Sequence, residues 1–416
     1  MLNVLINAYA ISPNWGSEQG VGWNWVSNIA KYCNCHIITE AEYQTEIEEA
    51  IAKHPYKDHM HFYFNAVTPE VRKMCWNQGD WRFYFHYEKW QKKTLEIAKE
   101  ICKKEKIDVI HHQNMVCFRE PGYLWQIEGI PYVWGPLGGM NRVPLAFTKG
   151  MPVKKKIFYL IKNTISLMQS RYKPRVLKAI KHSDVIITAT ASVYDCMVNY
   201  HKHKNVVFIN ETGVDLSKAV SVKHDYEHDT LELLWVGRFL ITKRLDIALN
   251  AIAKCRQQNV HLTIAGSGSV EEVAKYHGLA KQLGIEDKVT WLGSVENEEV
   301  HRLMKEKDAF FFTSIQEATS TVVPEAMQNN LPVISFNACG FGHLVKDKVG
   351  ETIELQKPEQ AAISFAAVID RLAVEKSSLK SYSEACNKYK QELSWQWKAE
   401  RVVELYHKAI ESKNRK

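Results

Sequence analysis

The sequence predicts an α/β protein made of two doubly wound units of parallel strands that face each other across a cleft. Short apolar runs of strand length alternate with helical patterns along the chain. The alternation stops in the polar, aperiodic stretch 217–229 and then begins again. The chain of 416 residues is also long for a single hydrophobic core.

The first unit is predicted over residues 1–215. It begins with a buried strand over Leu2–Ala8, and the turn-rich stretch Ser12–Gly20 leads into a helix over Val21–Tyr32. The remaining strands of this unit are predicted at His36–Thr39, Asp108–His111, Tyr132–Trp134, Val185–Thr190 and Val206–Ile209.

A linker is predicted over residues 216–230, and the second unit is predicted over residues 231–390. Its strands are predicted at Glu232–Val236, His261–Ala265, Val289–Leu292, Ala309–Thr313 and Pro332–Ser335. Its helices are predicted at Lys243–Lys254, Val270–Leu283, Asn297–Lys307 and Val322–Gln328. Because ligands of such sheets bind beyond the carboxyl ends of the strands, we expect a ligand site in the cleft.

The composition is that of an ordinary globular protein and argues against several function classes. The chain has 54 Lys and Arg against 47 Asp and Glu, a net charge of +7 at pH 7. This excess is too small and too scattered for a nucleic-acid binder, but it favours phosphate ligands or an anionic membrane surface. No apolar run has membrane-spanning length, and no secretory leader opens the chain. We therefore expect a cytoplasmic protein.

The cysteines and acidic residues predict no metal site. The nine cysteines are scattered, and the closely spaced pair Cys33 and Cys35 has no second pair to complete a zinc site. No Asp-x-Asp motif is present. We expect neither a metal nor another cofactor, and reduced thiols.

The strongest chemical motif is the segment from Glu317 to Glu325. It follows a predicted strand and enters a helix, with Pro324 in the first turn, where its missing N–H is harmless. A helix start with free N–H groups can bind a diphosphate, and a carboxylate can accept hydrogen bonds from sugar hydroxyls. The alternative is that Glu317 caps the helix and Glu325 is a solvated first-turn acid.

A second motif, Gly237-Arg238-Phe-Leu-Ile-Thr-Lys243, follows the first strand of the second unit. Cations at the carboxyl end of a strand would face the cleft, where they could neutralise charge that builds on a departing diphosphate. The alternative is an exposed basic pair without a function.

The two motifs, in this order and spacing, resemble the retaining glycosyltransferases of family 4, which have two Rossmann-like domains in the GT-B arrangement. The resemblance implies that Arg238 and Lys243 clamp the diphosphate, that Glu325 holds the ribose and that Glu317 lies near the transferred sugar. It also implies that the backbone of Thr319, Ser320, Thr321 and Val322 surrounds the phosphates. The family usually has glycine where Ala318 stands, which implies tighter crowding of the donor sugar.

The first half agrees with the resemblance. The stretch Asn14–Trp25 is similar to a glycine-rich loop of one branch of the family, in which Gly16 would approach the donor. In many relatives a strand ends His-x-His and the second histidine meets the donor sugar, but here Gln113 stands at that position. The sugar contact is therefore open between His111, His112 and Gln113, and each histidine could instead be structural. The family commonly ends in a helix that packs on the first domain, which is expected of residues 391–416.

The resemblance implies a metal-independent transfer of a sugar, with retention, from a nucleotide-diphosphate donor to an acceptor hydroxyl. The partners implied are a nucleotide sugar and a glycan or lipid-linked acceptor, in surface polysaccharide or glycolipid assembly. Three alternatives remain: a nucleotide-sugar epimerase or hydrolase of the same fold, a nucleotide-sugar binder without turnover, and a nicotinamide oxidoreductase. The last rests on Gly266-Ser-Gly268, where Glu271 replaces the third glycine of a dinucleotide fingerprint.

One further stretch suggests a membrane contact. Three lysines, Lys154–Lys156, precede a helical pattern of Ile157, Leu160, Ile161, Ile165 and Met168. Such a helix could lie on an anionic membrane and meet a lipid-linked acceptor. The alternative is an amphipathic helix packed on the first domain.

Overall fold

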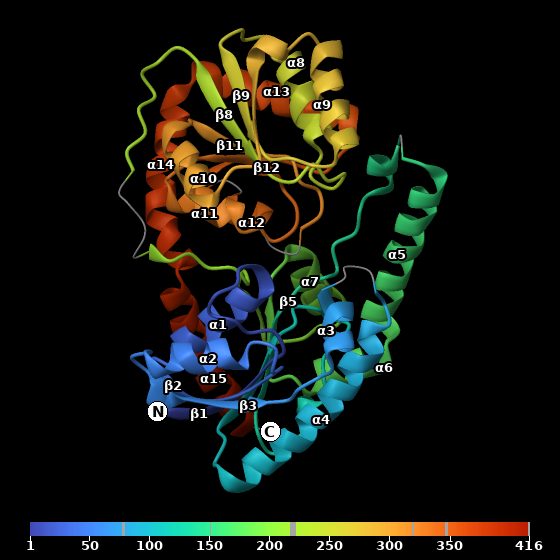
Figure 1. Ribbon diagram of the computed structural model, residues 1–416, viewed down its shortest axis with the longest axis vertical. Coiled ribbons are helices and arrows are strands. Elements are labelled where there is room, and N and C mark those ends of the chain that lie inside the picture. The colour runs from blue at the N-terminus through green and yellow to red at the C-terminus, as the bar shows by residue number, and fades with distance from the viewer. Residues whose placement is uncertain (77–79, 150, 217–221, 318–319, 346–347, 415–416) are drawn as a thin grey trace. The chain divides into compact units, whose positions relative to one another are not determined.

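The computed structural model describes residues 1–76, 80–149, 151–216, 222–317, 320–345 and 348–414 (Figure 1). The chain forms two compact units of α/β structure. Unit 1 comprises Met1–Met140, Ile165–Glu211 and the chain from Trp395 onward, and unit 2 comprises Asn141–Thr164 and Thr212–Ser394.

Unit 1 contains a seven-stranded parallel sheet with the order β3-β2-β1-β4-β5-β6-β7. The direction of winding reverses between the neighbouring strands β1 and β4, as in a doubly wound sheet. Its strands are β1 (Leu2–Ala8), β2 (Cys33–Thr39), β3 (Met60–Phe64), β4 (Val109–Asn114), β5 (Tyr132–Leu137), β6 (Val185–Thr188) and β7 (Val206–Phe208).

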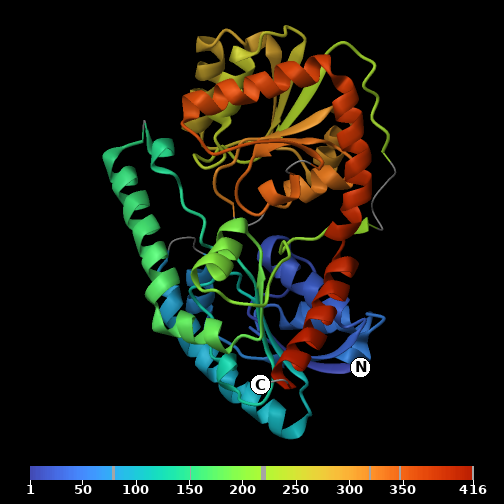
Figure 2. The ribbon, with the colours of Figure 1, turned by 180° about the vertical axis from the view of Figure 1, so that it is seen from behind.

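Helices cover both faces of this sheet, which is why its central strands are almost continuously buried. On one face α1 and α15 pack together, and α15 also contacts β4, β5 and β6, as the view from behind shows (Figure 2). On the other face α4 and α6 contribute to a second apolar cluster. The helices of the first half and the C-terminal helix are α1 (Ser17–Ile29), α2 (Gln44–Ala52), α3 (Pro69–Trp76), α4 (Phe83–Lys104), α5 (Val153–Tyr172), α6 (Pro174–His182), α7 (Ala191–Asp195) and α15 (Trp395–Asn414).

Unit 2 repeats the plan with a six-stranded parallel sheet of the order β10-β9-β8-β11-β12-β13. Its strands are β8 (Leu231–Val236), β9 (Val260–Ala265), β10 (Val289–Gly293), β11 (Ala309–Phe312), β12 (Val333–Phe336) and β13 (Gly350–Ile353). Its helices are α8 (Leu245–Lys254), α9 (Val270–Gln282), α10 (Asn297–Glu306), α11 (Val322–Gln328), α12 (Gly342–Val345), α13 (Pro358–Val374) and α14 (Lys376–Tyr389).

The α/β class and the two parallel sheets are as predicted, and the regular elements differ from the sequence prediction mainly at their ends. The first helix starts at Ser17 rather than Val21, so the glycine-rich stretch forms its first turns. Elements that the sequence analysis did not assign include α4, β13 and α13. Of the predicted linker, residues 217–221 lie outside the described part of the chain, and the described residues 222–228 have no regular structure.

The chain passes between the two units more than once. Residues 212–394 form the body of unit 2, and α15 returns to unit 1, where Trp25 contacts Trp395 edge to face. A stretch from the first half of the sequence, Asn141–Thr164, also clusters with unit 2. Its side chains Val143 and Phe147 are buried in the apolar core of that unit, beside residues of β8, β11 and α13.

Candidate functional site

The two predicted motifs of unit 2 meet because the strands that precede them are neighbours. β8 and β11 pair in parallel, with Phe310 opposite Leu234. The segments that follow these strands therefore leave the same edge of the sheet. They are joined by hydrogen bonds from the Ile315 N–H to the Thr242 carbonyl (2.9 Å) and from the Thr313 hydroxyl to the Lys243 carbonyl (2.9 Å). The parallel pairing thus brings residues some 75 positions apart into one site.

Lys243 and Glu317 form an ion pair at this edge. The Lys243 Nζ lies 2.5 Å from the Glu317 Oε1, and the side chains are 16% and 17% exposed. The Ser314 hydroxyl donates to the same carboxylate oxygen (2.7 Å), and the Lys243 ammonium lies 5.0 Å from the centre of the Phe312 ring. The pair is therefore held in place by the ends of both strands, and Glu317 does not cap the following helix.

Arg238 is placed differently from Lys243. Its side chain is exposed and makes no hydrogen bond or ion pair with the residues that the structure describes. Gly237, immediately before it, lies where β8 meets the glycine after β9: a Cβ on Gly266 would come within 1.9 Å of the Gly237 carbonyl oxygen. The close backbone approach fixes the end of β8, while the guanidinium of Arg238 remains available to a ligand.

Glu325 lies in the first turn of α11, and burial raises the pKa of its carboxyl group. No partner for this carboxylate occurs among the described residues. It is therefore not the fully solvated acid of the alternative interpretation. A partly buried carboxylate without a partner is suited to accept hydrogen bonds from a ligand hydroxyl, because such bonds would offset its desolvation.

The segment between the two glutamates is only partly described. Ala318 and Thr319, predicted to crowd the donor sugar and to line the phosphate site, lie outside the described residues. Ser320 is buried, Thr321 is exposed and Val322 is the first residue of α11.

In unit 1, the predicted glycine-rich loop leads into α1. Gly16 is the N-cap residue and is exposed, and a Cβ on it would meet no atom within 4 Å. Its neighbour Glu18 accepts a hydrogen bond from the Val116 N–H (3.2 Å), and burial raises the pKa of its carboxyl group. The space around Gly16 is therefore open.

The three candidate sugar contacts on β4 have different environments. Both ring nitrogens of His111 have partners at 2.7 Å, the Tyr406 hydroxyl and the Gly135 carbonyl, and burial lowers its pKa to about 4. His112 contacts Asn7 through Nδ1 (3.2 Å), and burial lowers its pKa to about 3. Gln113 is buried, yet neither its amide nitrogen nor its amide oxygen finds a partner among the described residues.

Sequence reasoning missed several polar residues beside these positions. Asn141 donates from its side-chain amide to the Glu317 carbonyl (2.5 Å). In unit 1, Asn7 donates to the Gln91 side chain (2.8 Å). The Trp134 indole N–H is buried without a partner in the described chain. No local pattern marks Asn141 and Asn7, because each is a single polar residue whose neighbours are distant in sequence.

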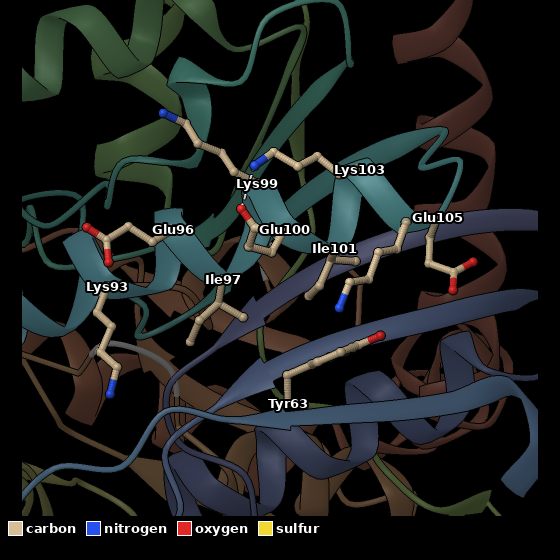
Figure 3. A pocket seen from close by; sticks show the side chains of 10 residues that line it. Tyr63, Lys93, Glu96, Ile97, Lys99, Glu100, Ile101, Lys103 and Glu105 are labelled. Atoms are coloured by element: carbon tan, nitrogen blue, oxygen red, sulfur yellow. Dashed lines mark hydrogen bonds and ion pairs between the residues drawn. The ribbon is translucent and has the colours of Figure 1, made fainter.

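A surface cavity of about 470 Å³ lies elsewhere, between the end of α4 and the edge strand β3 (Figure 3). Tyr63, Ile97 and Ile101 are its apolar residues, and the other lining residues are lysines and glutamates. None of the predicted site residues lines it. The described residues also contain no group of three His, Cys, Asp or Glu side chains placed to bind a metal ion.

The chain is similar to known glycosyltransferases. The family model of the glycosyl transferases group 1 matches residues 218–392. An uncharacterized glycosyltransferase, MJ1607 of Methanocaldococcus jannaschii, is 27% identical over 49% of this chain, and the match spans about half (51%) of that relative. The alpha-monoglucosyldiacylglycerol synthase of Streptococcus pneumoniae is 22% identical over 89% of this chain and 82% of its own length.

The fold has solved counterparts. The structure of Anabaena HepE in complex with UDP aligns with a TM-score of 0.59, at 14% identity, over 97% of this chain and 99% of its own. Two doubly wound parallel units define the GT-B class of α/β proteins. Within that class, the match to the group 1 glycosyl transferases covers the part of unit 2 that contains Lys243 and Glu317.

Proposed function

We propose that the protein is a retaining, metal-independent glycosyltransferase that moves a sugar from a nucleotide-diphosphate donor to an acceptor hydroxyl. One observation carries the proposal: Lys243 and Glu317 meet at the carboxyl edge of the unit 2 sheet, in a segment matched by the family model. The UDP bound to Anabaena HepE supports a nucleotide donor. The donor would rest mainly on unit 2, and the acceptor on unit 1.

The proposed chemistry needs no protein nucleophile. Arg238 and Lys243 would stabilise the negative charge that develops on the departing diphosphate. Glu325 would accept hydrogen bonds from the ribose, and Glu317 would hold the transferred sugar. The acceptor oxygen would attack from the face that the diphosphate leaves, and the departing phosphate would take its proton. The backbone of Ser320, Thr321 and Val322 would complete the diphosphate site.

The test combines binding and product analysis. Thermal shifts with UDP, GDP, ADP and their glucose esters identify the donor base, and product analysis shows whether the sugar is transferred, epimerised or only released. Arg238→Ala is expected to lower turnover by about 10²–10³, or about 3 kcal/mol in the barrier, because one preorganised charge is lost. The exposed Lys254→Ala on α8 is the matched control. Near-normal transfer by folded Arg238→Ala protein would contradict the clamp.

We also propose that helix α5 binds an anionic membrane surface, where a lipid-linked acceptor would be reached. Eight apolar side chains of α5 are each between 48% and 69% exposed: Val153, Ile157, Phe158, Leu160, Ile161, Ile165, Met168 and Tyr172. Its buried side chains are Ser166 and Ser170. This polarity is the reverse of that expected for a helix packed by its apolar face, and it favours the membrane proposal over the packing alternative.

Charge supports the same proposal. Lys154, Lys155 and Lys156 occupy the first turn of α5, and Lys162 and Arg171 follow. Apolar residues buried at the interface together with basic residues near it are typical of helices that lie on anionic membranes. In the described parts of the chain, no helix combines the length and apolar composition that crossing a bilayer requires.

Flotation with phosphatidylglycerol vesicles tests this part of the proposal. Each basic residue near the surface contributes about 1 kcal/mol, so Lys154→Ala/Lys155→Ala/Lys156→Ala is expected to reduce binding strongly. The control, Lys93→Ala/Lys99→Ala/Lys104→Ala on the exposed face of α4, removes the same charge. Equal flotation of the two triple variants would contradict membrane binding by α5.

A further inference from the structure

A segment from the first half of the chain contributes to the donor side of unit 2. Residues 141–149, called the arm below, follow β5 in sequence but cluster with unit 2. Val143 and Phe147 of the arm are 1% exposed and are buried among residues of unit 2. Burial of two apolar side chains makes the arm an integral part of that unit rather than a surface loop.

The first contact of the arm is with Glu317. The Asn141 side-chain amide donates to the Glu317 carbonyl oxygen at 2.5 Å. On its other side, the Glu317 N–H donates to the Cys339 sulfur (3.2 Å). The backbone of Glu317 is thus held at both its N–H and its carbonyl by residues outside its own segment. Its carboxylate, which reaches Lys243, is positioned by that backbone.

The second contact of the arm is with Arg244, the residue after Lys243. The Arg244 guanidinium lies 5.1 Å from the centre of the Phe147 ring and donates to the Phe147 carbonyl (3.5 Å). Arg244 has a φ of +53°, in the left-handed region that an arginine adopts only when its surroundings hold it there. Asp246 accepts two hydrogen bonds from the same guanidinium, at 2.8 and 2.6 Å.

The arm therefore touches both sides of the Lys243–Glu317 pair. It contacts the backbone of Glu317 through Asn141 and the residue adjoining Lys243 through Phe147. The arm is also tied to α5, since Asn163 donates to the Val143 carbonyl (2.8 Å) and accepts from its N–H (3.3 Å). A segment bound at both ends has a defined conformation, so Asn141 is presented to Glu317 in one place.

We infer that Asn141 is a positioning residue of the donor site, which fixes Glu317 for its contact with the transferred sugar. The inference rests on the proposed function. Since Asn141 holds Glu317 rather than the cations, it acts on the sugar end of the donor and not on the diphosphate end. Loss of Asn141 should weaken the binding of a nucleotide sugar more than that of the nucleoside diphosphate alone.

Two variants and one control separate this role from a general effect on folding. Asn141→Ala removes the amide, and Asn141→Asp keeps its shape but places a carboxylate oxygen against the Glu317 carbonyl. Arg142→Ala is the matched control, because Arg142 is the exposed next residue of the arm. Melting temperatures show whether each variant is folded.

The experiment is calorimetric titration of UDP, GDP or ADP, whichever binds the wild type, and of its glucose ester. Asn141→Ala is expected to weaken the glucose ester about fivefold, the usual loss for one hydrogen bond, and to leave the nucleoside diphosphate within about twofold. Asn141→Asp should lose more than Asn141→Ala, and Arg142→Ala should match the wild type.

The outcomes are distinguishable. If the wild type binds none of the nucleotides, the proposed function fails and the role of Asn141 fails with it. If the wild type binds, two results overturn the role of Asn141 alone. One is equal weakening of nucleotide and nucleotide sugar in Asn141→Ala. The other is unchanged affinity for both ligands in Asn141→Ala and Asn141→Asp.

Discussion

Replacement of Glu317 by glutamine should tighten the binding of a free nucleoside diphosphate while it abolishes most of the sugar transfer. In the structure the Glu317 carboxylate forms an ion pair with the Lys243 ammonium at 2.5 Å, so a diphosphate bound as proposed would compete with it for that cation. Glutamine keeps the size of the side chain but removes the negative charge. The free cation and the loss of a nearby like charge both favour an anionic ligand.

The size of the effect follows from the burial of the pair. The two side chains are 16% and 17% exposed, so the pair is less screened than a surface ion pair, whose contribution is about 0.2–1 kcal/mol. We take about 1 kcal/mol as the free energy of the Lys243–Glu317 pair, which corresponds to about fivefold tighter binding of the nucleoside diphosphate once the pair is removed. Turnover should fall by about 10², because the contact with the sugar proposed for the carboxylate would be lost.

The assay is calorimetric titration of the Glu317→Gln protein with the nucleoside diphosphate, paired with initial rates of transfer. Glu286→Gln, an exposed acid next to β10, removes the same net charge and should leave affinity unchanged. The gain in affinity should shrink at high salt. Equal or weaker binding by Glu317→Gln would refute the competition between Glu317 and the diphosphate for Lys243.

Two further predictions concern pH. Because burial raises the pKa of Glu325, its folded form binds a proton more tightly than the unfolded chain does, and stability falls as the pH rises from about 4.3 through the raised pKa. Glu325→Gln should lack this fall in urea unfolding and should bind the nucleotide more weakly; parallel pH profiles would contradict the burial argument. Burial lowers the pKa of His111 to about 4 and of His112 to about 3. The folded protein therefore holds both rings neutral, and their contribution to the free energy of unfolding is complete above about pH 6.5 and is lost as the pH falls. Each of the two histidines should lower the free energy of unfolding by about 1.4 kcal/mol per pH unit as the pH falls from about 6 to 5. His112→Asn should remove the part of this loss that is due to His112; identical pH dependence of stability in the variant and the wild type would disprove the effect of its burial.

The fold and the main motif residues could be predicted because both follow from local patterns. Alternating apolar runs and helical periodicities fix the order of strands and helices, and parallel strands place their carboxyl ends at one edge. Lys243 and Glu317 follow such strand ends, so their meeting could be expected from the sequence order. That they form an ion pair with each other in the free protein could not, because the pairing depends on the geometry of two loops.

The choice between His111, His112 and Gln113 illustrates a second limit. The three residues are consecutive on β4, and alternate residues of a strand face opposite sides of the sheet. Tyr406, almost three hundred positions away on α15, contacts His111, while Gln113 is left without a partner among the described residues. No property of the local sequence distinguishes a satisfied buried side chain from an unsatisfied one.

The sequence by itself determined the α/β class, the two parallel units and the positions of Arg238, Lys243, Glu317 and Glu325 at strand and helix ends, because hydrophobic periodicity and motif spacing are local properties. Only the tertiary structure showed that Asn141 contacts Glu317, that His111 has two partners and that the apolar face of α5 is exposed. These facts depend on which distant segments pack together, and packing depends on the whole set of surfaces that are buried at once.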